Sequence, residues 1–233
     1  MRVRVATTAF GTITAFGVLA LPACSADTTE AKPAAASSSS SIEGPVTDGQ
    51  TAAPLTSAEL EKRLLDVSDL GNGYTPKPEQ SAQHDDVTVL GCPGLNDLGG
   101  DAATGGSLDF VRQAKATFTY NGSSSSEVSE ELYSDAPAKL SAGASQIYDA
   151  MTGCPEYQVL VGGSAIDITT QKIPAPQLGA ERWSQLMTFS VGGRDTVMKQ
   201  SAIRDDSVLV IVSGSPALVD RHIGKALAKA ATR

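Results

Sequence analysis

The chain has 233 residues, three cysteines, two histidines and a formal net charge of −8. This length allows one domain or a domain with a tail, and 41% hydrophobic residues are enough to form a core. The acidic charge argues against a nucleic-acid-binding protein, which would present a basic face to phosphates. Three cysteines exclude a zinc site built on two CxxC pairs, and the sequence contains no phosphate-binding loop.

The N-terminus has the organisation of an export signal. Arg2 and Arg4 precede a mostly apolar run from Val5 to Leu21. Seventeen helical residues span about 25 Å, which is less than the roughly 30 Å hydrocarbon core of a bilayer. The run therefore favours a cleaved signal over a permanent anchor.

The apolar run ends in Leu21-Pro22-Ala23-Cys24, which resembles the lipobox of bacterial lipoproteins. The resemblance implies a diacylglycerol thioether on Cys24, removal of residues 1–23 and tethering to the outer face of the cell membrane. Ordinary secretion with an incidental thiol at Cys24 is the alternative. Cleavage would also remove Arg2 and Arg4, and the more acidic product would be repelled by an anionic membrane, so the lipid would have to hold it.

Residues 24–54 comprise the lipidated cysteine and a flexible tether. The segment is rich in Ala, Ser, Thr, Pro and Gly, includes five consecutive serines at 37–41, and contains almost no large apolar residues. Such a composition cannot bury enough apolar surface to offset the entropy lost on ordering. About thirty random-coil residues reach roughly 30 Å, enough to separate a small domain from a membrane surface. A single ordered domain is predicted over 55–233.

The first part of this domain shows apolar residues at helical spacing in some segments and at alternating spacing in others. Thr56 or Ser57 is expected to cap the first helix, with Glu59 in its first turn. The predicted elements are a helix over 57–67, a glycine-rich loop region over 75–109, strands over 114–120 and 127–133, and a helix over 137–152.

The C-terminal part predicts an antiparallel meander. Trp183, Gln185, Met187 and Phe189 alternate on one face of a strand, and short turns lead into strands over 196–203 and 208–212. The last strand is apolar on both faces and should be central. With a final helix over 216–231, the pattern predicts an α+β domain whose mainly antiparallel sheet carries about three helices, all on one face.

Two cysteines remain if Cys24 carries lipid. Cys92 and Cys154 stand in the same local frame, Gly-Cys-Pro, which stops regular structure and exposes a cysteine at the end of an element. Outside the cell such thiols tend to oxidise, so we predict a disulfide between them. A redox-active pair is the alternative, although that chemistry favours close spacing such as CxxC.

The sequence contains few signs of a catalytic site. No Gly-x-Ser-x-Gly elbow is present, and His84 beside two aspartates is best interpreted as part of a solvated loop. His222 is interpreted as a surface residue, and Trp183 as a core residue, with a ligand platform as the alternative. We predict no catalytic residue, no metal site and no cofactor, and the sequence does not identify ligand-binding residues.

The order of several short motifs is familiar. Four motifs follow one another along the chain: a helix that ends in residues 64–74, the loop cysteine in Gly91-Cys92-Pro93, an Ala-rich helix that ends in Gly153-Cys154, and Leu178–Glu181 before the meander. Their order resembles the extracellular sensor domain of mycobacterial receptor Ser/Thr kinases of the PknH type, and its free-standing actinobacterial lipoprotein relatives. The resemblance implies an antiparallel sheet with flanking helices and a cleft for an unidentified ligand.

The leading functional hypothesis is a membrane-anchored, extracytoplasmic and non-enzymatic binding or sensor module of the cell envelope. Its expected partners are the membrane, through the lipid on Cys24, and an unidentified envelope ligand or protein, but no nucleic acid. One alternative is a lipid carrier, which would need a large apolar cavity. Another is an envelope hydrolase with an unfamiliar carboxylate site.

Overall fold

A computed structural model describes residues 53–78, 87–98, 110, 112–121 and 125–232. All of them belong to the unit Thr47–Arg233. The predicted signal peptide, Cys24, most of the predicted tether and His84 lie outside the described residues. No described helix is long and apolar enough to cross a membrane.

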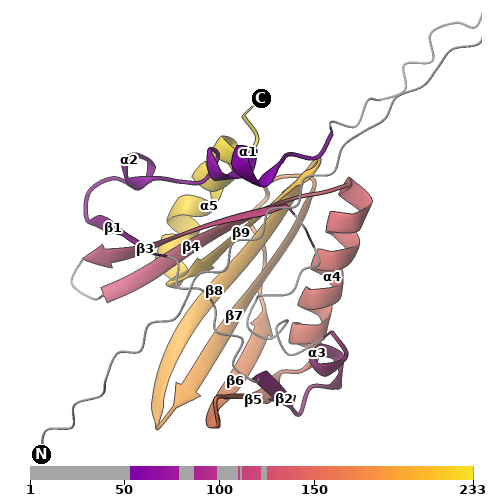
Figure 1. Cartoon of the computed structure of the whole chain (residues 1–233). Helices are drawn as coiled ribbons and strands as arrows, with labels where there is room; N and C mark the ends of the chain where they lie inside the picture. The colour runs from indigo at the N-terminus through magenta and orange to yellow at the C-terminus, as the bar shows by residue number, and fades with distance from the viewer. Residues whose placement is uncertain (1–52, 79–86, 99–109, 111, 122–124, 233) are drawn as a thin grey trace, which may run out of the picture. The chain divides into compact units, whose positions relative to one another are not determined.

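The described residues form one nine-stranded sheet in which all neighbouring strands are antiparallel (Figure 1). The order across it is β1-β3-β4-β9-β8-β7-β6-β5-β2. The strands are β1 Tyr74–Lys77, β2 Val87–Leu90, β3 Gln113–Asn121, β4 Ser125–Ser134, β5 Glu156–Val161, β6 Ser164–Lys172, β7 Glu181–Val191, β8 Arg194–Asp205 and β9 Val208–Gly214. The predicted C-terminal meander is confirmed and is longer than expected, because β5 to β9 are consecutive neighbours.

The helices of the described part number five, not about three. They are α1 Ser57–Glu61, α2 Val67–Leu70, α3 Pro93–Asp97, α4 Pro137–Gly153 and α5 Pro216–Ala230. The helix predicted over 57–67 ends early, because Asp66 starts a second one: its side chain accepts hydrogen bonds from the N–H groups of Ser68 and Asp69. The predicted cap at Thr56 is confirmed, with Glu59 completing a capping box.

The long helices cover opposite faces of the sheet, so the prediction that all helices share one face is wrong (Figure 1). Strand β9 explains why. Val208, Val210 and Val212 pack in a core with α5, α1 and α2, whereas Leu209 and Ile211 pack in a core with α4. Successive residues of a strand point to opposite faces, so a strand that is apolar throughout requires cover on both sides. We call these two sides the α5 face and the α4 face.

The predicted disulfide is present. Cys92 and Cys154 are joined with a Cα–Cα distance of 5.5 Å. Cys92 immediately precedes α3 and Cys154 immediately follows α4, so the bond fixes the short helix against the end of the long one.

His222 is buried, not at the surface as the sequence suggested. The residue is 4% exposed, and its Nε2 lies 2.6 Å from the hydroxyl of Tyr74. Burial, together with the nearby charges of Arg221 and Lys225, lowers the pKa of His222. The pair joins α5 to the edge strand β1 through a polar contact inside the α5 face.

Candidate functional site

A pocket of about 370 Å³ opens at the start of β7, where Ala180, Glu181, Arg182 and Trp183 line it. Strand β7 begins here because of a close backbone approach. Gly179 has φ +60°, and a Cβ at this position would lie 2.8 Å from the carbonyl oxygen of Arg204. The N–H of Ala180 donates to that same carbonyl oxygen. The glycine therefore lets the chain turn tightly onto β8 and places the pocket residues.

The acidic wall of the pocket is held by neighbours on two elements. Ser141 of α4 donates to Glu181 Oε1 at 3.0 Å, and Arg204 Nε of β8 donates to Oε2 at 2.6 Å. The hydrogen bond from Arg204 is the main reason that the pKa of Glu181 lies below its ordinary value. At neutral pH this wall carries a fixed carboxylate whose two oxygens already have partners.

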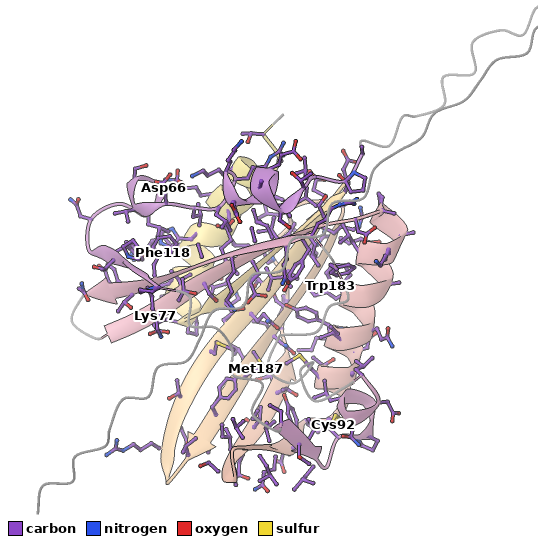
Figure 2. The ribbon with its side chains drawn as sticks, viewed as in Figure 1. Asp66, Lys77, Cys92, Phe118, Trp183 and Met187 are labelled. Atoms are coloured by element: carbon purple, nitrogen blue, oxygen red, sulfur yellow. A yellow bond between two sulfur atoms is a disulfide. The ribbon has the colours of Figure 1, made fainter. Side chains whose placement is uncertain are left out.

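The aromatic wall is Trp183, the chain's only tryptophan. It is half-buried, and its ring centroid lies 6.2 Å from that of Tyr148 on α4, with an angle of 30° between the rings. Figure 2 shows Trp183 beside α4. Trp183 packs against the α4 core, as the sequence predicts, and it also lines the pocket.

Two buried polar groups lie on the α4 side near Trp183. Gln185 follows Trp183 by two residues on the same face of β7 and is fully buried. Its Nε2 donates to Gln200 Oε1 at 2.9 Å, and it contacts Met151 Sδ at 3.2 Å. Within the described part of the chain, neither Gln185 Oε1 nor the Tyr148 hydroxyl has a hydrogen-bond partner.

These unpaired atoms have an energetic consequence. A buried polar atom without a partner costs about 1–3 kcal/mol. Burial, and then the negative charge of Glu131, raise the pKa of Tyr148 well above its ordinary value, so its hydroxyl stays protonated. The α4 face therefore holds a buried, unpaired amide oxygen and a buried neutral hydroxyl near Trp183, which lines the pocket.

Sequence reasoning placed Gln185 on the same strand face as Trp183 but did not single it out. The feature that marks Gln185 in the sequence is that it is a polar residue between Trp183 and Met187, which face inward on the same strand. Tyr148 falls within the helix predicted over 137–152, and nothing in the sequence marks its hydroxyl as unpaired. The predicted pair Cys92 and Cys154 lies in a different core, with α3, β2 and β5, and contributes to structure.

No metal site competes with this interpretation in the described residues, which contain no group of three or more His, Cys, Asp and Glu side chains able to hold an ion. Sequence comparisons add no assignment: no protein-family model matches the chain, and no curated protein matches it.

Comparison with solved structures gives a clear result for the fold. The extracellular domain of PknH from Mycobacterium tuberculosis matches with a TM-score of 0.57 and 16% sequence identity, over 76% of this chain and 97% of that domain. This chain has the fold of that extracellular domain. The resemblance predicted from short motifs is thus confirmed for the fold. A protein from Mycobacterium smegmatis described as an Rv0999 ortholog also matches, with a TM-score of 0.38 and 11% identity over 71% of this chain and 96% of that one.

Proposed function

We propose that this protein is an extracytoplasmic, lipid-anchored sensor module that binds a small polar ligand at the Trp183 pocket and catalyses no reaction. The observation that carries the proposal is the pair of buried, unpaired polar atoms on Gln185 and Tyr148 near an open aromatic pocket. A fold shared with an extracellular domain supports an extracytoplasmic location. The lipobox ending in Cys24 supports attachment through a lipid.

The ligand chemistry follows from the pocket. Trp183 offers apolar ring surface in the pocket. The amide oxygen of Gln185 is buried outside the pocket lining and needs a hydrogen-bond donor that reaches it from there. The carboxylate of Glu181 and the guanidinium of Arg182 both line the pocket, so its wall carries charges of both signs. These groups suit a neutral molecule with both an apolar face and hydroxyl or amide donors, which describes a sugar of the cell envelope better than a free acyl chain.

The unique tryptophan allows a direct binding assay. Neutral oligosaccharides from bacterial cell wall are titrated into the full chain while Trp183 emission is followed. A true ligand changes the emission saturably. It also stabilises the protein by RT ln(1 + [L]/Kd), which is about 2.7 kcal/mol at a hundredfold excess over Kd.

A pair of variants tests whether the buried amide takes part. Gln185→Met keeps the volume but removes the amide, and it should weaken binding at least tenfold. Gln171→Met is the matched control, because Gln171 is exposed on β6 and points to the opposite face. Equal affinity in both variants would exclude this site, and failure of every fragment to bind would count against a sugar ligand.

The anchor is tested separately. Mass spectrometry of protein purified from membranes should show a diacylated N-terminal Cys24, and Cys24→Ala should release the protein into the medium. Acyl chains in an organic extract of the released protein would instead support a lipid carrier.

A further inference from the structure

Glu130 carries a carboxyl group that is buried in the apolar core of the α5 face. It is 1% exposed. Its Oε2 accepts a hydrogen bond from the backbone N–H of Leu65 at 2.6 Å, whereas Oε1 has no partner among the described residues. A buried carboxylate with an unpaired oxygen is costly, and adding a proton removes most of that cost.

The position of Glu130 on β4 explains its burial. Val128, Glu130 and Leu132 alternate onto the α5 face, and Val128 and Leu132 belong to the core there. The neighbours of Glu130 across the sheet are Ala116 of β3 and Val212 of β9, and neither carries a charge. Its only hydrogen bond in the described structure comes from the segment that joins α1 to α2.

The charged groups that face Glu130 come from the two elements packed over it. Lys229 of α5 favours the ionised form, and Asp69 of α2 disfavours it. Lys229 is itself paired with Asp66 and Asp69, so much of its charge is already compensated. Helix α1 contributes the apolar Leu60 to this core. Burial dominates, and it raises the pKa of Glu130 to about 7.

The same segment is also held to α5 by other contacts in the range from pH 6 to 8.5, in which Glu130 gains or loses its proton. Arg63 donates to the carbonyl of Ala230 at 2.8 Å, and Lys225 donates to the carbonyl of Asp69. The hydrogen bond from Lys229 keeps the pKa of Asp66 far below this range. Glu130 is thus a buried carboxyl group that titrates in this range and contacts residues 55–70, which we call the clasp segment.

We propose that Glu130 is a proton-operated latch for the clasp segment: the protonated carboxyl holds residues 55–70 against β4 and α5, and loss of the proton promotes their release. The first 54 residues of the chain lead directly into this segment. Its release would lengthen the link between the sheet and the N-terminus. The latch lies on the opposite face from the Trp183 pocket, and it does not depend on the proposed ligand.

The expected size of the effect follows from proton linkage. Release would expose Glu130 to water and return its pKa from about 7 to the ordinary 4.5. The closed state binds more protons between these two values, so the equilibrium constant for opening rises with pH across that range. Between pH 6.0 and 8.5 the expected rise is about tenfold.

Hydrogen–deuterium exchange of the full chain tests the latch. Protection of peptides from residues 55–70, corrected for the intrinsic pH dependence of exchange, should fall about tenfold from pH 6.0 to 8.5. Glu130→Gln keeps an acceptor for the Leu65 N–H but cannot titrate, so its protection should not follow this dependence. The matched control is Glu131→Gln, since Glu131 is half-buried on the opposite face and pairs with Lys115. That variant should behave like the wild type.

A second measurement does not rely on a folded variant. A ¹³C NMR titration of the wild-type chain should show one glutamate carboxyl that titrates near pH 7. If every glutamate titrates below pH 5.5, the latch is refuted. It is equally refuted if Glu130→Gln retains the full tenfold pH dependence, or if the wild type shows none.

Discussion

Loss of the Cys92–Cys154 disulfide should destabilise the domain strongly. The bond joins residues separated by 62 positions, and the loop between them contains α3, β3, β4 and α4. In the chain-entropy account, closing a loop of this length lowers the conformational entropy of the unfolded chain, which stabilises the folded state by about 4 kcal/mol. A domain of ordinary stability has only about 5–15 kcal/mol in total, so the double variant Cys92→Ala, Cys154→Ala should lose a quarter of its stability or more.

Urea unfolding of the full chain at pH 7 measures this loss. With a slope of about 2 kcal/mol per molar urea, a loss of 4 kcal/mol moves the midpoint down by roughly 2 M. Wild-type protein treated with a reductant should approach the same midpoint. Cys24→Ala is the matched control, because Cys24 is not a partner in the bond, and its midpoint should equal that of the wild type.

Two results would refute the reasoning. One is a double variant whose unfolding free energy lies within about 1 kcal/mol of the wild type, because the loop-closure account then fails for this chain. The other is oxidised wild-type protein with free thiols at Cys92 and Cys154, which would remove the bond and weaken the case for an oxidising location.

Three further predictions concern the sheet and the α5 face. Gly214→Ala should cost about 3 kcal/mol or more in urea unfolding, because the new Cβ would lie 2.1 Å from the carbonyl oxygen of Glu127 at a φ of +140°. Leu132→Ala should cost about 2–5 kcal/mol in the same assay, because Leu132 is fully buried in the core of the α5 face. The pKa of His222 lies below its ordinary 6.5 in the folded protein, so the contribution of His222 to stability, measured as the difference between the wild type and His222→Phe, should fall as the pH drops below about 6.5, with a sign opposite to that of Glu130. His222→Phe should remove this dependence in thermal unfolding, at the cost of the hydrogen bond to Tyr74, and an unchanged profile would contradict the assignment.

Much of the sheet could be predicted from local patterns. The run Val208–Val212 indicated a central strand, and it lies between β4 and β8. A strand that is apolar on both faces needs cover on both faces, which already excludes a sheet with every helix on one side.

The burial of His222 could not be predicted from composition alone. His222 follows Val219 by three residues and precedes Ala226 by four, so it falls within the buried stripe of α5. A histidine is usually assigned to the polar side. Its partner Tyr74 is 148 residues away in the sequence, and only the pairing of β1 with β3 brings the two together.

The break between α1 and α2 has a local cause that periodicity obscures. Leu60, Leu64 and Leu65 suit one continuous helix, but the side chain of Asp66 binds two N–H groups ahead of it and begins a new turn. An aspartate offers its own backbone an alternative to the continuing helix. The break also directs the N–H of Leu65 towards Glu130.

Glu130 and Gln185 show what the alternating pattern indicates when a polar residue interrupts it. Glu130 stands between Val128 and Leu132 on β4, and Gln185 between Trp183 and Met187 on β7. Each is buried with one side-chain oxygen unpaired within the described structure. An apolar residue at either position would avoid that cost, so each interruption points to a function more than to stability. The difference between them is chemical: a carboxyl group removes its cost by binding a proton, whereas an amide cannot, and its oxygen needs a hydrogen-bond donor from water or a ligand.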